Sequence, residues 1–260
     1  MKWFGSSLLV IASLLTSSFL LLPVLALLLH VSWHTLWGIW MQDGKSPFIL
    51  SIETTFVTMI TVLILGTPLG WVLARGKHWS WRVLEYLLQI PLLMPPLAIG
   101  LLLVYFYGPY GFIGQVLSHW QISAVNTALA VVIAQVYESA PYYIFTVQGA
   151  FRQVDRGFEH LSYSLGVSPL RTFWRITLPL ALPGVGVGIT MAFARAIGAY
   201  GAIIVVAYNP HTLPISIWVA LEEQGLPVAL PLALLLIVTA LPLPMATVLW
   251  RRIRSAAIES

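Results

Sequence analysis

Few side chains of this sequence are able to do chemistry, because only 8% of its 260 residues are charged. A soluble domain carries about a quarter charged residues. The six histidines are dispersed without metal-ligand spacing, and there is no cysteine for a disulfide or a thiolate metal site. The sequence also lacks the G-x-x-x-x-G-K-[ST] loop that binds nucleotide phosphates. We therefore expect no catalytic site, no metal and no cofactor in this chain.

Two charged residues, Glu138 and Arg195, lie well inside long apolar runs. Each is about ten residues from the end of its run that lies nearest the basic segments, which is ~15 Å at ~1.5 Å per helical residue. A bare charge at that depth in a bilayer is costly, so it must face a partner or a water-filled path. Either the two side chains form an ion pair between neighbouring helices, or each faces an aqueous cavity separately. Direct attraction of an oxyanion by Arg195 is a third interpretation.

The densest group of charges lies in a polar segment that interrupts the apolar runs. It holds six of the 22 formally charged residues, namely Arg152, Asp155, Arg156, Glu159, Arg171 and Arg175. Asp155 predicts the start of a short helix over about 156–165, since aspartate is a favoured N-cap, and Gly166 suits its C-terminal cap. The dipeptide Ser168-Pro169 predicts the start of a second helix over about 169–177.

The remaining sequence is dominated by apolar residues, which make up 59% of the chain, and the mean hydropathy is +0.89. Such an excess does not fit inside one soluble core, whereas runs of about 20 apolar residues cross a bilayer as helices. Six runs have this length, at approximately 8–29, 48–74, 84–107, 125–148, 181–208 and 228–250. We therefore predict an all-α integral membrane protein with six transmembrane helices, the first of them retained rather than cleaved as a signal peptide.

Lysine and arginine orient these helices. Eleven of the 13 basic residues fall on one side of a six-span arrangement, while Lys45 falls on the other side and Arg195 within a span. The positive-inside rule then predicts that both termini and the loop over residues 150–179, between the fourth and fifth spans, are cytoplasmic. Because the basic residues stand at the ends of apolar runs, the pI of 9.5 does not indicate a nucleic-acid partner.

Five positions of the polar loop resemble a known signature, E-A-A-x3-G-x9-I-x-L-P. They are Glu159, Gly166, Ile176, Leu178 and Pro179, with His160 and Leu161 in place of the two alanines. This is the signature loop of permease subunits in binding-protein-dependent ABC importers, in which the loop forms a coupling helix that sits in a groove of the ATPase subunit. The resemblance implies that these five residues couple this chain to an ATPase.

Two further segments are similar to permeases for oxyanions. The segment 91–96 and the glycines after it look like the third-span region of molybdate and sulfate permeases, and the segment 191–202 is similar to the fifth-span region of molybdate/tungstate permeases. Relatives of that type usually place an acid where this chain has Ala199, and Glu138, which lies at the same depth as Arg195, offers a substitute partner. Arg195, Glu138 and Tyr200 are the candidate residues of the transport path or of an ion pair within the membrane.

The resemblance implies a single transmembrane permease domain over residues 1–260, a homodimer, in the bacterial or archaeal cell (inner) membrane. Two ATPase subunits would hold ATP and Mg²⁺, and an extracytoplasmic solute-binding protein would deliver molybdate or tungstate; the alternative cargo is sulfate or another small solute. From the residues alone, the polar loop could also be a helix pair resting on anionic lipid. An ion-coupled secondary transporter would need internal repeats, and a membrane enzyme would need clustered catalytic groups; the sequence shows neither.

Overall fold

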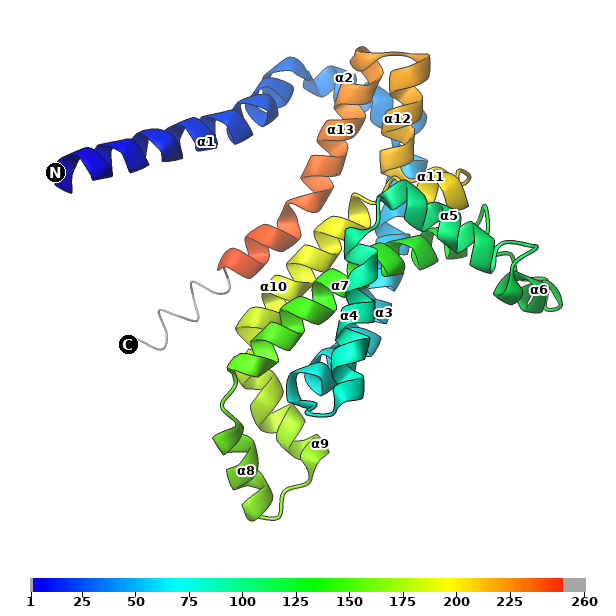
Figure 1. Cartoon of the computed structure of the whole chain (residues 1–260). Coiled ribbons are helices and arrows are strands. Elements are labelled where there is room, and N and C mark those ends of the chain that lie inside the picture. The colour runs from blue at the N-terminus through cyan, green and yellow to red at the C-terminus, as the bar shows by residue number, and fades with distance from the viewer. Residues whose placement is uncertain (1, 250–260) are drawn as a thin grey trace.

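The computed structural model describes the backbone of residues 2–249 and the side chains of residues 9–42 and 44–249. Within this part of the chain all regular structure is helical, and the helices form an elongated bundle with two arms (Figure 1). The helices are α1 (Lys2–His30), α2 (Trp33–Ile39), α3 (Lys45–Arg75), α4 (Trp79–Leu93), α5 (Pro96–Tyr107), α6 (Phe112–Ser118), α7 (Ala128–Gln153), α8 (Arg156–Ser164), α9 (Pro169–Thr172), α10 (Leu178–Ile197), α11 (Ile203–Val206), α12 (Leu213–Glu223) and α13 (Leu226–Ala240).

Five helices of the described chain are long and apolar enough to cross a membrane, or six if the bent pair α4 and α5 is one span. The predicted all-helical membrane fold is therefore confirmed at this level, while the number of spans and the side on which each terminus lies stay predictions. Three of the arginines used for the orientation, Arg251, Arg252 and Arg254, lie outside the described residues.

The centre of the bundle is α7, which packs between α3 and α10. Its side chains Tyr143, Val147 and Phe151 are fully buried against residues of both neighbours. Nearer the start of α7, the side chain of Gln135 forms a polar bridge to both neighbouring helices. Its Oε1 accepts from Thr58 at 2.9 Å, and its Nε2 donates to the Ala196 carbonyl at 3.1 Å. Because an unpaired amide is costly away from water, these bonds fix the register of all three helices.

Close contact between α7 and α10 depends on a glycine. A Cβ placed on Gly184 would lie 2.4 Å from the Cβ of Ala150, whereas a Cβ on Gly149 would meet nothing within 4 Å in the described chain. We expect Gly184→Ala to destabilise the purified protein by about 1–3 kcal/mol, because overpacking forces the helices apart. Gly149→Ala is the matched control and should be neutral or slightly stabilising, since alanine is the better helix former. Thermal unfolding midpoints in detergent would decide; equal midpoints for the two variants would contradict the packing argument.

The run predicted as the third span, about residues 84–107, does not form one continuous helix. The chain forms α4 and α5 instead, and the axes of the two differ by 113° at the break between them. Two consecutive prolines explain the bend, because a residue before proline is pushed out of the helical region. Met94 and Pro95 accordingly have ψ angles of 137° and 140°.

The run predicted as the fifth span, about residues 181–208, is divided between two helices, and the first of them begins earlier than the run. The helix ends at Ile197, and after a short break α11 begins at Ile203. This break fits closely against α5, since a Cβ on Gly201 would lie 2.6 Å from the Cβ of Pro96. At the other end no break occurs: α9 continues through a π-helical turn, Phe173–Thr177, directly into α10.

No break occurs at Pro179 or Pro183, although proline often interrupts a helix. A proline inside a helix removes one backbone hydrogen bond. Pro179 follows the π turn directly as the second residue of α10, where the bonding pattern already departs from that of an α-helix, whereas Pro183 lies inside α10. The polar loop is consequently a rigid extension of α10.

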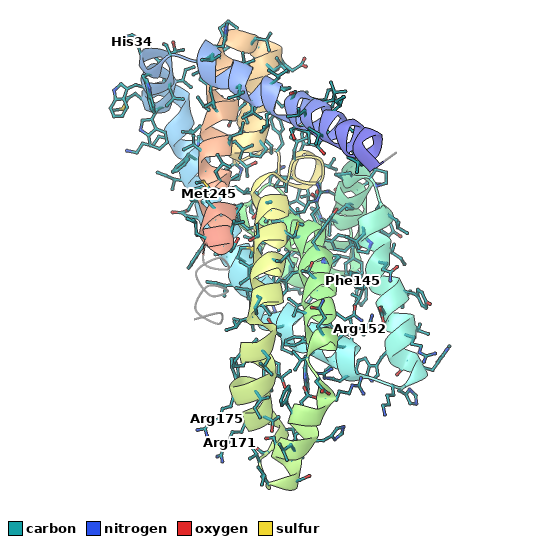
Figure 2. All side chains as sticks on the ribbon, turned by 90° about the vertical axis from the view of Figure 1, so that its left-hand side faces the viewer. His34, Phe145, Arg152, Arg171, Arg175 and Met245 are labelled. Carbon is teal, nitrogen blue, oxygen red and sulfur yellow. The ribbon has the colours of Figure 1, made fainter. Side chains whose placement is uncertain are left out.

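Three parts of the chain project from the central bundle. Helix α1 extends away on one side and contacts mainly α13, while α5 and α6 extend on the other side (Figure 1). Helices α8 and α9 project from one end, and Figure 2 shows Arg171 and Arg175 there, at the end opposite to His34. The ends of α3, α4 and α7 meet near this projection, because Arg152 pairs with Glu85 at 3.1 Å and Arg75 pairs with Glu159 at 2.9 Å. The basic residues thus gather at one end of the bundle.

Candidate functional site

The projecting loop is a pair of helices whose ends follow the local sequence signals. The side chain of Asp155 accepts a hydrogen bond from the Gly157 N–H at 2.8 Å, which confirms the predicted N-cap of α8. Gly166 has a φ of +76°, a conformation that glycine adopts without strain. Ser168 precedes α9 as predicted, although its side chain makes no capping bond.

The turn around Gly166 is closed by two further bonds. The Gly166 N–H donates to the carbonyl of Tyr163 at 2.9 Å, and the Val167 N–H donates to the carbonyl of Ser162 at 3.1 Å. This is the pair of bonds that defines a Schellman motif, which ends a helix and satisfies its last carbonyls. A further bond joins the two helices, between the hydroxyls of Ser162 and Thr172 at 2.8 Å. The tip of the loop therefore has a fixed shape.

The position assigned to the signature glutamate is wrong by one residue. The pattern E-A-A-x3-G places its glutamate six residues before the glycine, which in this chain is His160, and Glu159 lies one residue earlier. The structure separates the two side chains accordingly. Glu159 is 5% exposed and points into the protein, whereas His160 is exposed on the loop surface. The second part of the pattern, Gly166 to Ile176, Leu178 and Pro179, keeps its spacing.

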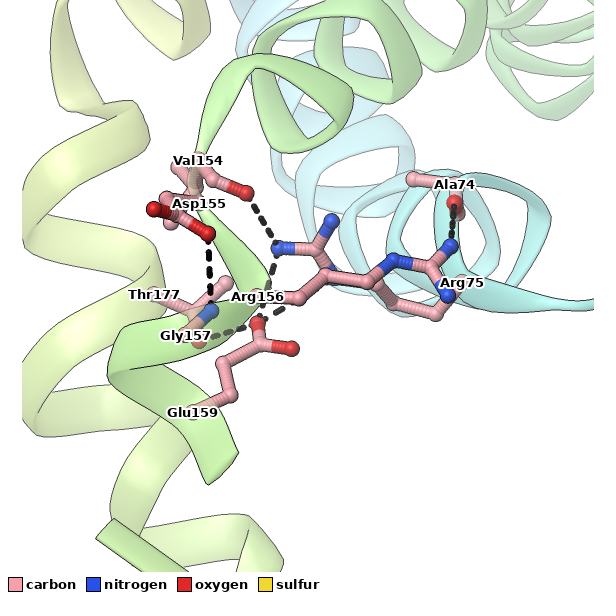
Figure 3. Close-up of polar contacts among 8 residues, drawn as sticks. All are labelled: Ala74, Arg75, Val154, Asp155, Arg156, Gly157, Glu159 and Thr177. Carbon is pink, nitrogen blue, oxygen red and sulfur yellow. Dashed lines mark hydrogen bonds and ion pairs between the residues drawn. The ribbon is translucent and has the colours of Figure 1, made fainter. Parts of the chain in front are cut away.

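The buried carboxylate of Glu159 is the centre of a polar cluster (Figure 3). Its Oε1 accepts from Arg75 Nε at 3.2 Å, from Arg75 Nη2 at 2.9 Å and from the Thr177 hydroxyl at 2.8 Å. Arg75 Nη2 also donates to the carbonyl of Val154 at 3.0 Å, and Arg156 Nη2 donates to that of Ala74 at 3.2 Å. Burial, with a smaller contribution from the Glu159 charge, raises the pKa of the nearby Tyr163, and the Arg75 charge partly offsets this shift.

The outer face of the loop combines exposed apolar side chains with cations. Leu165, Leu170 and Trp174 are 76%, 70% and 60% exposed. Arg171 and Arg175, four residues apart, are also exposed on the second helix. Of the predicted coupling residues, Ile176 is half-buried and Leu178 packs against the central core, so these two position the loop rather than form its outer face.

Glu138 and Arg195 lie in contact inside the bundle. Arg195 Nη2 is 3.0 Å from Glu138 Oε2, and the exposed fractions of the two side chains are 33% and 1%. The other carboxylate oxygen of Glu138 accepts from the Ala202 N–H at 3.3 Å, at the start of α11. The guanidinium carbon of Arg195 also lies 5.8 Å from the centre of the Tyr142 ring. One carboxylate thus bridges the end of α10 and the helix that follows the break.

Tyr200, the third candidate of the transport path, is not part of this pair. Its ring packs against Trp218 on α12, with centroids 6.4 Å apart. Sequence reasoning gave Arg75 and Arg156 no role of their own, because nothing in the local pattern distinguishes them from the other basic residues of the span ends and the polar loop. In the described residues no group of three or more histidine, aspartate or glutamate side chains is placed to hold a metal ion.

Comparison with known proteins gives consistent matches over most of the chain. The molybdenum transport system permease protein ModB of Mycobacterium tuberculosis is 36% identical over 228 residues, which cover 85% of this chain and 86% of that protein. The probable sulfate transport system permease protein cysT of Chlorokybus atmophyticus is 33% identical, over 78% and 74%. The molybdate/tungstate transport system permease protein WtpB of Pyrococcus abyssi is 32% identical, over 72% and 70%.

The fold is also shared with a solved structure. A chain in the crystal structure of a bacterial ABC transporter involved in the import of alginate superimposes with a TM-score of 0.70, at 17% identity, over 96% of this chain and 97% of that one. The model of the family described as "Binding-protein-dependent transport system inner membrane component" matches residues 66–258. With its bundle of apolar helices and its projecting signature loop, this chain belongs to that family.

Proposed function

We propose that this chain is the permease subunit of an ABC importer that passes molybdate or tungstate across the cell membrane of a bacterium or archaeon. The observation that carries the proposal is the rigid helix pair α8–α9, which projects from the basic end of a membrane bundle and exposes apolar and cationic side chains. An exposed apolar patch rimmed by charge is typical of a protein interface. Its partner is the ATPase subunit, which binds ATP and Mg²⁺, and this chain itself is non-catalytic.

The assembly we propose contains two copies of this chain, two ATPase subunits and an extracytoplasmic binding protein. The positive-inside rule supports a cytoplasmic location for the α8–α9 loop, since the basic residues gather at that end. Exposure supports the second copy: residues 9–26 of α1 are exposed and mostly apolar, and the side chain of Arg195 is 33% exposed. Because a charge does not face hydrocarbon, that exposed part of Arg195 faces an aqueous path or the other copy.

Mechanical coupling follows from the continuity of the loop with α10. When ATP closes the ATPase pair, the two loops move, and α10 moves with its loop because no flexible joint separates them. Such rigid-body motion of helices is a common way to alternate access between the two sides of a membrane.

The named relatives support molybdate or tungstate as the cargo, since two of them are permeases for molybdenum, molybdate or tungstate. Molybdate, tungstate and sulfate are all tetrahedral dianions, and the relative that carries sulfate in its name makes sulfate the second candidate. Selectivity in this proposal resides in the binding protein rather than in the path, since the charge of Arg195 is compensated by Glu138.

Reconstitution tests this proposal. Proteoliposomes that contain this chain, its ATPase and its binding protein should take up molybdate only with ATP, and tungstate should compete more strongly than sulfate. Affinity purification of the chain should also recover the ATPase. Uptake that persists without any ATPase would indicate an ion-coupled transporter and would overturn the proposal; uptake inhibited most strongly by sulfate would reassign the cargo.

A further inference from the structure

The buried side of the loop joins parts of the chain that are far apart in sequence. Arg75 is the last residue of α3, Glu159 lies in the first turn of α8, and Thr177 is the last residue before α10. Their side chains meet at a single oxygen, Glu159 Oε1, at distances of 2.8–3.2 Å (Figure 3). We refer to these three residues as the clasp.

A second bond runs in the opposite direction beside the clasp. The carbonyl of Ala74 is one of the last four of α3, which have no partner within the helix. Arg156, from the loop, donates to this carbonyl at 3.2 Å, while Arg75, from α3, donates to Val154 at the start of the loop at 3.0 Å. The end of α3 is therefore bound to the loop by two crossed arginines.

The loop is not connected to α3 by neighbouring residues of the chain. The loop is covalently continuous with α7 and α10, but 84 residues separate Arg75 from Glu159. Glu159 is 5% exposed and its Oε1 accepts three hydrogen bonds within this chain, so the carboxylate is directed mainly into the permease. The residue at the signature offset that is exposed to a partner is His160.

We propose that the clasp positions α3 on the loop, so that α3 follows the loop whenever the ATPase moves it. This inference rests on the proposed function and adds a role that the signature does not assign: Glu159 acts inside the permease, through Arg75, rather than at the interface. Breaking a buried, hydrogen-bonded ion pair strands a charge, so the clasp stays closed while the loop moves. Both α3 and α10 then carry the motion, on opposite sides of α7.

A charge exchange in the reconstituted complex tests the clasp. Arg75→Glu and Glu159→Arg should each lower molybdate uptake per ATP hydrolysed by about tenfold, within the range for residues in one ion-pair network. The double variant, which restores opposite charges, should recover most of the loss. Thr177→Val removes one donor without stranding a charge and should give a smaller loss in the same direction.

The exchange of Glu85 and Arg152 is the matched control. This pair joins α4 to α7 at the same end, but Arg152 is 51% exposed, so the same exchange should leave uptake per ATP unchanged. If the clasp had a purely structural role, its variants would unfold at a lower temperature, but the protein that remains folded would show normal uptake per ATP. That result, or wild-type coupling in Arg75→Glu, overturns the clasp. Should the wild-type chain itself recover no ATPase and drive no uptake, the proposed function fails instead.

Discussion

Replacing either Glu138 or Arg195 with glutamine should destabilise the permease by about 3–5 kcal/mol, and replacing both should cost much less than the sum. The reason is the environment of the pair. Glu138 is 1% exposed and has two partners, Arg195 and the Ala202 N–H. When Arg195 is lost, a carboxylate stays buried without its counter-charge; when both are changed, two neutral amides replace the pair and no charge is stranded.

A double-mutant cycle on thermal or denaturant unfolding in detergent measures this coupling. The control is the cycle of Glu85→Gln and Arg152→Gln, since this pair is more exposed and should show a coupling of about 0–1 kcal/mol. The same four variants of the Glu138–Arg195 cycle should be assayed for uptake. Purely additive effects on both stability and uptake would mean that the two side chains act separately, each toward an aqueous cavity.

The contacts of Glu138 should also affect the segment after α10 and the rate at which the cargo is released. Because Glu138 accepts from the N–H of Ala202, the residue directly before α11, loss of its charge should loosen α11 as well as the end of α10. Arg195 free of Glu138 would become a stronger anion site, and a tighter site slows release. We therefore expect Glu138→Gln to lower the rate of uptake more than it lowers the amount of assembled complex.

Sequence alone predicted the features that depend on neighbouring residues or on bulk apolarity. The cap at Asp155 and the positive φ of Gly166 follow from a few adjacent residues, and hydropathy located most of the long helices. Equal depth in the membrane was enough to suggest that Glu138 and Arg195 meet.

Features set by contacts between distant segments were not predictable in the same way. The 113° bend between α4 and α5 was signalled by prolines, but its size depends on how α5 packs against α11. The π turn before α10 has no sequence signal of its own. The clasp was missed because Arg75 differs from the other basic residues at the ends of the spans only in its partner, 84 residues away. The signature glutamate was also assigned one residue too early, which placed it at the buried Glu159 instead of the exposed His160.

Substitution of Gly166 is the second change that should strongly lower ATP-driven uptake. Two causes of such a loss, a changed shape of the turn and a lost contact with the ATPase, can be distinguished by experiment. Gly166 holds a φ of +76° in the Schellman motif, and a Cβ there would meet nothing within 4 Å in the described chain. Valine in this backbone conformation costs about 1–2 kcal/mol or more, so Gly166→Val should open the turn between α8 and α9. We expect ATP-driven uptake to fall by at least about tenfold, because 1.4 kcal/mol already changes an equilibrium constant by that factor.

Asparagine is the matched control, because it has a Cβ yet tolerates the left-handed conformation. If the shape of the turn is what the ATPase requires, Gly166→Asn should keep most of the uptake that Gly166→Val loses, and both proteins should remain folded. If the ATPase instead packs directly onto this glycine, both variants should lose uptake and copurify less ATPase. Equal, near-normal uptake in the two variants would contradict a role of the shape of this turn in coupling.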